Sequence, residues 1–311
     1  MIYIFVNFSR MKNMALIPPH YLNSVVSIEV ERKNDKDEIQ KVSIATGFLV
    51  GKLTGKSNEK GPLYNLFLVT NRHVFQNEKT NQLLKEAFFR FNTTDNKGHY
   101  FKVNLLRTDN THIWSMHSDE KVDLAVLPIN AKAINDAKIN YHFFSDTDLF
   151  YARDFKSKNI HTGDSLFVLG FPMSINGKAK NFVIVRQGII ARVDEEVLNE
   201  RFYYIDASAY PGNSGGPVIV KPEIVSIQGT TSNNSAGLIG VISSGETYSD
   251  VAVSSQTGEA RVIFTEQTGL VRIVPIELIY EIIDTITKPT TLLQEAKVED
   301  VSSSAKEEIK N

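Results

Sequence analysis

Short runs of β-branched and aromatic residues alternate with polar loops along most of the chain, a pattern typical of antiparallel strands. Six such runs lie in the first half, at residues 24–30, 43–50, 66–69, 87–91, 100–106 and 124–128. Six more follow in the second half, at residues 165–170, 182–193, 202–205, 218–220, 238–242 and 262–264. We therefore expect an all-β protein in which each set of strands forms an antiparallel barrel.

Two segments depart from the strand pattern. Residues 75–86 are the best candidate for a helical insertion in the first half. After Pro275, the residues Leu278, Ile279 and Ile282 recur at helical spacing, which predicts a C-terminal helix docked on a barrel. The expected organisation is then an N-terminal extension, a first barrel, a connector, a second barrel, the helix and a flexible tail. These occupy residues 1–21, 22–131, 132–161, 162–274, 275–288 and 289–311.

Composition indicates an ordinary soluble enzyme. The 311 residues include 34 basic and 36 acidic side chains, for a net charge of −2, so neither a nucleic-acid nor a membrane partner is expected. The chain has no cysteine, which excludes disulfides and thiol catalysis. The apolar residues 1–6 lack a basic lead, which favours a cytoplasmic protein with export as the alternative. Met11 and Met14 leave open whether residues 1–13 belong to the native protein.

Residues 210–217, Tyr-Pro-Gly-Asn-Ser-Gly-Gly-Pro, place Ser214 among glycines just before an apolar run. A serine hydroxyl becomes a nucleophile only with a base in reach and backbone N–H groups aimed at the developing oxyanion. Gly212 can adopt the backbone dihedrals that direct consecutive amides into one small volume. The segment is therefore a candidate nucleophile loop.

The order of residues along the chain separates two interpretations of Gly-x-Ser-x-Gly. An α/β-hydrolase needs its histidine after the serine, yet all seven histidines precede Ser214. The order His, Asp, Ser is instead available. His73 follows the apolar run 66–69 in a polar turn, and Asp123 interrupts the apolar run 122–129, where a buried carboxylate needs a hydrogen-bonding partner.

With these three segments, residues 45–50, 168–172 and 240–245 complete a pattern that resembles a trypsin-like serine peptidase, over roughly residues 22–285. It is similar to the protease domains of bacterial DegP/HtrA and glutamyl endopeptidases. The resemblance implies two packed six-stranded antiparallel β-barrels, protein or peptide substrates, and neither cofactor nor metal. It makes His73 the general base, Asp123 its orienting partner and Ser214 the nucleophile, with the amides of Gly212 and Ser214 as the oxyanion hole. No stretch beyond the helix is long enough for a PDZ domain.

The same resemblance places Ser208 at the floor of the substrate pocket and Ser243, Ser244 and Gly245 along its wall. A neutral floor favours a small or medium apolar residue at the cleaved bond. Asn213 stands where zymogen-activated members carry an aspartate. An amide has no charge to pair with a newly cut N-terminus, so activity is expected not to require such a cut.

Several alternatives stay open. The main function expected is an endopeptidase for regulated or site-selective processing, with a regulatory protein as a possible partner. The alternative is a catalytically silent protease fold used as a binding or scaffold module, and an esterase using the same triad is a third. His112 and His117 are five residues apart, a spacing that suits neither one strand face nor adjacent helical turns, so no metal site is expected there.

Overall fold

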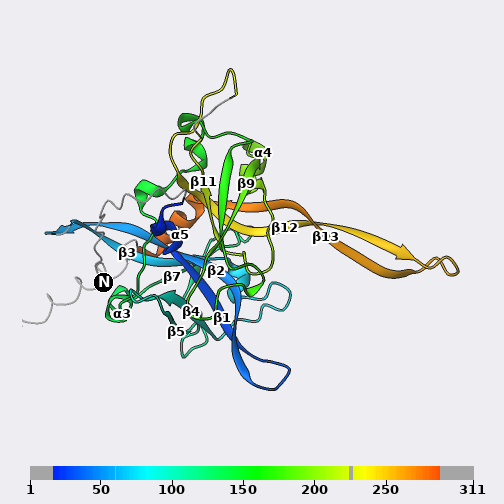
Figure 1. Cartoon of the computed structure of the whole chain (residues 1–311), viewed down its shortest axis with the longest axis horizontal. Coiled ribbons are helices and arrows are strands. Elements are labelled where there is room, and N and C mark those ends of the chain that lie inside the picture. Colours follow the sequence, from blue (N-terminus) through cyan, green and yellow to red (C-terminus); the bar gives the residue numbers. More distant parts are fainter. Residues whose placement is uncertain (1–16, 60, 224–226, 288–311) are drawn as a thin grey trace, which may run out of the picture.

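The computed structural model describes residues 17–59, 61–223 and 227–287, and it confirms the expected all-β fold (Figure 1). The first half is a seven-stranded antiparallel sheet with the order β5-β4-β1-β2-β3-β7-β6. Its strands are β1 (Val25–Lys33), β2 (Ile39–Asn58), β3 (Gly61–Thr70), β4 (Glu86–Asn92), β5 (Gly98–Asn104), β6 (Ser115–Met116) and β7 (Ala125–Pro128).

This first half differs from the expected six-stranded barrel. The extra strand, β6, has two residues and is too short to be visible as an apolar run. The sheet has its ends at β5 and β6, and among the described residues a single bridge, Leu106 to His112, spans the turn between them. Asn110 takes a positive φ of 64° in that turn. Because β5 and β6 do not pair with each other, the first half is an open sheet rather than a closed barrel.

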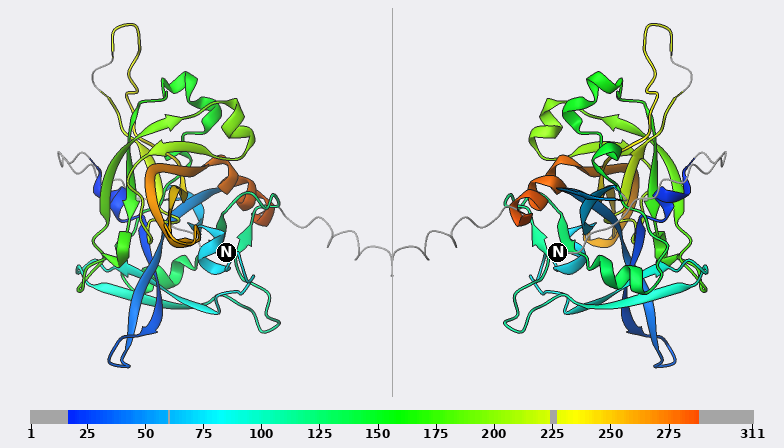
Figure 2. Two further views of the ribbon diagram at one scale, coloured as in Figure 1. Left: turned by 90° about the vertical axis from the view of Figure 1, so that its right-hand side faces the viewer. Right: turned by 90° about the vertical axis from the view of Figure 1, so that its left-hand side faces the viewer.

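The second half is a closed six-stranded barrel with the order β10-β13-β12-β11-β8-β9, as expected. Its strands are β8 (Ser165–Gly170), β9 (Ile184–Arg192), β10 (Tyr203–Asp206), β11 (Pro217–Val220), β12 (Gly237–Val253) and β13 (Ala260–Pro275). Viewed along the long hairpin of β12 and β13, the first half lies below the second (Figure 2).

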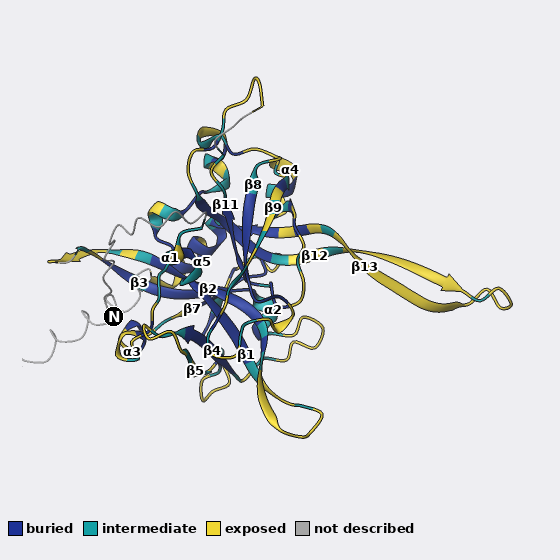
Figure 3. Ribbon diagram, in the orientation of Figure 1, coloured by how far each residue is buried: buried dark blue, intermediate teal, exposed yellow. Residues whose placement is uncertain are grey.

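A shared apolar core joins the two halves (Figure 3). Phe48 and Val69 from the first half and Phe167 and Leu169 from the second belong to one buried cluster. Phe144, from the connecting segment, is 1% exposed and lies in the same cluster. Because removing this much apolar surface from water is strongly favourable, the halves are held as one body with a cleft along their junction.

Short helices lie between the strands, and the last helix follows the final strand. They are α1 (Pro19–Leu22), α2 (Arg72–Phe75), α3 (Ala131–Asp136), α4 (Glu195–Asn199) and α5 (Glu277–Thr287). The expected C-terminal helix is α5, which follows the second barrel but packs on the first half. The Tyr280 hydroxyl donates to the Gly51 carbonyl at 3.2 Å, and Lys52 pairs with Asp284 at 3.0 Å.

The helix expected over residues 75–86 is wrong, because α2 ends at Phe75. The Asn77 side chain accepts hydrogen bonds from the backbone N–H groups of Lys79 and Thr80 at 3.0 Å. Asn81 then adopts a positive φ of 55°. Such side-chain bonds to local backbone compete with helical bonding, so this stretch folds into a turn.

Hairpins extend beyond the compact body, and two of them project on opposite sides of the molecule (Figure 1). One joins β2 to β3, and the longer one joins β12 to β13. For β12 and β13 the sequence pattern predicted only residues 238–242 and 262–264, since the outer parts are not buried and show no clean alternation.

The expected tail over 289–311, and the extension as far as residue 16, lie outside the described residues. Within the described part of the chain, no helix is long and apolar enough to cross a membrane.

Candidate active site

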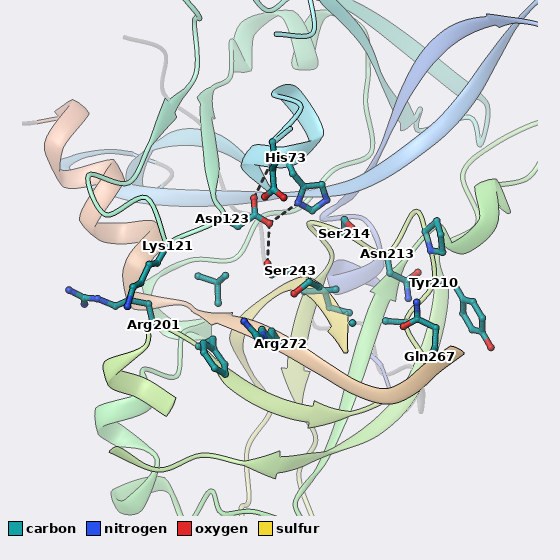
Figure 4. A pocket seen from close by; sticks show the side chains of 18 of the residues that line it. His73, Lys121, Asp123, Arg201, Tyr210, Asn213, Ser214, Ser243, Gln267 and Arg272 are labelled. Carbon is teal, nitrogen blue, oxygen red and sulfur yellow. Dashed lines mark hydrogen bonds and ion pairs between the residues drawn. The ribbon is translucent and has the colours of Figure 1, made fainter. Parts of the chain in front are cut away.

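A cleft of about 770 Å³ lies between the two halves and brings the three predicted catalytic residues together (Figure 4). His73 and Asp123 reach it from the first half, and Ser214 reaches it from the second. His73 lies in α2, the short turn directly after β3, as the sequence predicted. Asp123 lies two residues before β7 begins, so it precedes the strand rather than interrupting it.

Asp123 holds His73 through two contacts. One carboxylate oxygen lies 2.7 Å from His73 Nδ1, and the other accepts from the His73 backbone N–H at 3.0 Å. A carboxylate can only accept here, so Nδ1 carries the proton and Nε2 is left free to accept one. The imidazole is therefore in the tautomer and orientation that a general base requires.

Two further residues fix Asp123. The Asn71 side-chain amide donates to the Asp123 carbonyl at 2.8 Å, and the Ser243 hydroxyl donates to Asp123 Oδ2 at 3.0 Å. Ser243 was expected only as part of the pocket wall. The structure gives it this additional contact from β12 of the second barrel, which the sequence could not reveal because it joins residues far apart in the chain.

Electrostatics in the cleft favour a charged pair. Burial opposes protonation of the imidazole, but the hydrogen bond and charge of Asp123, with a contribution from Glu78, outweigh it and raise the pKa of His73 above its usual value. Burial also opposes ionisation of Asp123, yet hydrogen bonds from His73 and Ser243 keep the pKa of this carboxyl below its usual value. An imidazolium formed during a reaction would thus be stabilised by Asp123.

The Ser214 loop depends on glycine. Gly212 has φ of +100°, and a Cβ there would lie 2.4 Å from the carbonyl oxygen of Phe171. Gly215 has φ of +80°, and a Cβ there would lie 2.2 Å from the Thr46 carbonyl oxygen and from the Thr70 hydroxyl. Both positions combine a strained backbone for other residues with a steric clash, so the glycines predicted from the motif are required by the geometry.

The backbone of this loop leaves two amides available. The Pro211 carbonyl accepts from the Met173 N–H at 2.7 Å and is thereby occupied outside the loop. Within the described chain, the N–H groups of Gly212 and Ser214 have no acceptor. Donors without protein partners beside a serine are what an oxyanion hole requires. No hydrogen bond joins the Ser214 hydroxyl to His73 among the described residues.

Thr46 is a residue whose role the sequence did not show. It is fully buried on β2, and its hydroxyl donates to the Gly212 carbonyl at 2.7 Å and accepts from the Phe171 N–H at 3.1 Å. Its backbone N–H donates to the Ser214 carbonyl at 2.9 Å. The first half of the molecule thereby holds the nucleophile loop of the second.

The pocket wall follows the prediction more closely than the floor does. Ser243, Ser244 and Gly245 line the cleft, whereas Ser208 is exposed and is not among the lining residues. Three residues of β13, Gln267, Arg272 and Val274, line it in addition. Gln267 Oε1 lies 2.6 Å from where a Gly245 Cβ would be, and Arg272 is paired with Glu246.

Asn213 is 1% exposed, and neither polar atom of its side chain has a hydrogen-bonding partner in the described part of the chain. There is accordingly no ion pair at this position of the kind that an aspartate would make. That activity needs no newly cut N-terminus stays a prediction.

A metal site has little support in this geometry. His73, Glu78 and Asp123 are close enough to share a cation, with their ligand atoms within 4.8 Å of one another. His73 Nδ1 is already bonded to Asp123, however, so a metal there would compete with the triad. His112 contacts the Trp114 carbonyl, and His117 pairs with Glu281 at 2.9 Å, so these two histidines have separate partners.

One closed barrel, a second antiparallel sheet and the cleft between them define a peptidase of the trypsin-like class, and comparison with known proteins agrees. Residues 45–222 match the trypsin-like peptidase domain, and the chain belongs to this family. It is 25% identical to the serine endoprotease DegS of Haemophilus influenzae over 222 residues, which are 70% of this chain and 47% of DegS. It is 26% identical to a serine protease HtrA-like protein of Staphylococcus aureus over 213 residues, which are 64% of this chain and 22% of that protein. The chain thus spans less than half the length of either relative.

Proposed function

We propose that this protein is a serine endopeptidase with the triad His73, Asp123 and Ser214. The observation that carries the proposal is the 2.7 Å contact between His73 Nδ1 and Asp123 Oδ2 in the cleft that Ser214 lines. His73 Nε2 takes the proton of Ser214 as the hydroxyl attacks the peptide carbonyl. The amides of Gly212 and Ser214 bind the oxyanion.

To complete acylation, His73 gives this proton to the leaving amine, and an acyl-enzyme remains on Ser214. Water, deprotonated by the same imidazole, then releases the new carboxyl end and restores the hydroxyl. Protein or peptide substrates follow from the family. A regulatory protein partner and action in the cytoplasm belong to the same proposal.

Selective rather than broad cleavage is supported by the pocket. The Gln267 side chain lies against Gly245, and both residues line the cleft. The charge of Arg272 is balanced by Glu246, and both side chains of this pair are partly exposed to solvent. A pocket narrowed by Gln267, in which Arg272 is paired, favours a small or medium apolar residue at the cleaved bond.

A proteome-derived peptide library tests the proposal. Wild-type protein is expected to generate new peptide N-termini that share one preferred residue before the cut, and Ser214→Ala is expected to generate none. Identical cleavage patterns for both proteins would contradict the assignment of Ser214.

The second candidate is a silent protease fold that binds proteins without cutting them. It is favoured by one observation, which is that Ser214 and His73 share no hydrogen bond among the described residues. Catalytic contacts in resting enzymes are often long and tighten only when substrate binds, so this observation weighs less than the ordered His73–Asp123 pair. Peptide binding without cleavage would favour this candidate.

A further inference from the structure

The long hairpin of β12 and β13 projects away from the compact body (Figure 1). From Thr247 to Val253, β12 pairs with β13 alone among the described strands, and we call residues 247–267 of this hairpin the arm. Nearly the whole arm is exposed (Figure 3), with Tyr248 61% and Phe264 55% open to solvent. Two-stranded ribbons are marginal in water and clusters of exposed apolar side chains mark interaction sites, so the arm points to a partner.

One face of the arm combines apolar side chains with unpaired acids. Tyr248 lies opposite Glu266 in the register of the hairpin. Two residues further along β12, Asp250 lies opposite Phe264, and because alternate residues of a strand point to the same side, all four side chains share one face. Neither acid forms an ion pair with a described residue, and the arm holds three acids against one base, Arg261. This face is therefore apolar and acidic.

A second exposed apolar surface lies beside the nucleophile loop. Met173 and Phe182, in the segment between β8 and β9, are 56% and 57% exposed, and Tyr210 is 40% exposed. The Met173 N–H donates to the Pro211 carbonyl at 2.7 Å, which joins this segment to the nucleophile loop next to Tyr210. We call residues 173–186, together with Tyr210, the loop patch.

The loop patch is basic. It holds Lys178, Lys180 and Arg186 and no acidic residue. Lys180 Nζ lies 5.1 Å from the centre of the Phe182 ring, and the Arg186 guanidinium lies 5.0 Å from the centre of the Tyr210 ring. None of the three cations forms an ion pair with a described residue. The loop patch therefore exposes apolar side chains as the arm does, but carries the opposite charge.

We propose that the acidic face of the arm docks on the loop patch of a second copy of this chain. Both surfaces are exposed in the single chain, so the arm does not cover the loop patch of its own copy. Apolar side chains would meet at the centre of the contact, with Asp250 and Glu266 facing the cations of the loop patch. About a two-fold axis each copy would receive the arm of the other, which closes the assembly as a dimer.

The size and the charge of the two surfaces support a second copy as the occupant. One arm face and one loop patch together expose on the order of 1,000 Å², the lower limit of a specific interface, and a two-fold dimer contains two such contacts. Complementary charge fixes the register and the choice of partner more than the affinity. Because one chain carries both charges, every copy supplies both sides of the contact. The inference goes beyond the proposed function and does not depend on the chemistry of Ser214.

Sedimentation equilibrium of the Ser214→Ala protein, which is expected not to digest itself, tests the proposal. The protein is expected to be monomeric at about 1 µM and dimeric at about 100 µM, as a contact with a micromolar Kd requires. A protein that stays monomeric at the higher concentration would overturn the proposal.

Charge reversal in the same protein locates the contact. The arm variant carries Asp250→Lys with Glu266→Lys, and the patch variant carries Lys178→Glu with Lys180→Glu. Each is expected to raise the Kd of self-association by about tenfold or more. An equimolar mixture of the two is expected to recover the wild-type Kd to within about threefold, because the reversed arm meets the reversed patch and the native arm meets the native patch. A mixture that associates no better than either variant alone would contradict the proposal.

The matched control is Asp35→Lys with Glu59→Lys, which makes the same change in net charge as the arm variant at exposed positions of two other hairpins. Its Kd is expected to stay within about twofold of wild type, since these positions lie outside the contact. An equal loss in the control would show that net charge governs association, and the proposal would be wrong. Loss in the arm variant with wild-type association of the patch variant would show that the arm binds elsewhere, which also overturns it.

Discussion

At the scale of single residues, catalysis depends on the proton at His73 Nδ1 and the free lone pair at Nε2. Asp123 controls both, because it accepts from the ring at 2.7 Å and from the backbone N–H at 3.0 Å. Its carboxylate is itself held by Ser243. An amide in its place would preserve the shape of the site while favouring the wrong tautomer.

The variant Asp123→Asn is therefore expected to lower kcat/KM by about 10²- to 10⁴-fold without loss of folding. The pH profile gives a second signature. His73 must be neutral to accept a proton, so activity rises with pH through its pKa, which Asp123 raises above the ordinary value of 6.5. The acidic limb of kcat/KM is expected above that value in wild type and at lower pH in Asp123→Asn. Glu78→Gln is expected to shift the limb in the same direction by less.

The pocket prediction also belongs to this scale. Because the Gln267 side chain occupies space against Gly245, Gln267→Ala is expected to raise kcat/KM at least tenfold for substrates with leucine or phenylalanine before the cut. Substrates with alanine there are expected to change little. Gln256→Ala, at the tip of the same hairpin, is the control for general effects. An unchanged preference in Gln267→Ala would show that this side chain does not limit the pocket.

At the scale of elements, helix α5 contributes to stability because it follows the second barrel yet packs on the first half. Ile282 on this helix is 3% exposed, whereas Ile286 one turn later is 39% exposed. Ile282→Ala is expected to lower the free energy of unfolding by about 2–5 kcal/mol, since it leaves a cavity in the shared core. Ile286→Ala is expected to cost below about 0.5 kcal/mol. Chemical denaturation measures both, and equal losses would contradict the packing.

Element types were predictable where burial imposes a pattern. The runs that became β8 and β11 are almost wholly buried, and the sequence placed them to within a residue. The outer part of the β12–β13 hairpin could not be predicted. Its two strands are exposed and pair with each other, so no pattern of buried residues marks them in the sequence. The helix predicted over residues 75–86 is wrong because the Asn77 side chain closes a turn there, which the apolar pattern of the sequence does not reveal.

For the site, the order of His73, Asp123 and Ser214 predicted three residues that the fold does bring to one cleft. The sequence did not reveal the roles of Thr46 and Gln267 or the hydrogen bond from Ser243 to Asp123. Each depends on a neighbour that is distant in the sequence. Ser208 was placed at the pocket floor by its spacing from Ser214, and spacing alone does not determine which way a loop residue faces.

At the scale of the whole molecule, the two halves are coupled at Thr46. Its hydroxyl serves both the Gly212 carbonyl and the Phe171 N–H across the junction. Thr46→Val keeps the shape but leaves both buried groups unpaired, so it is expected to destabilise the protein by about 1–3 kcal/mol and to lower kcat. Thr46→Ser retains the hydroxyl and is expected to remain close to wild type in kcat. Equal behaviour of the two variants in denaturation and turnover would show that the hydroxyl does not hold the loop.

The most direct test of the triad is labelling with a fluorophosphonate, which forms a covalent bond to an activated serine oxygen as fluoride leaves. Mass spectrometry of wild-type protein is expected to place the adduct on Ser214. The adduct is expected to be absent in Ser214→Ala and to form far more slowly in Asp123→Asn. Folded wild-type protein that takes up no label, or takes it up at another residue, would contradict a competent His73–Asp123–Ser214 site.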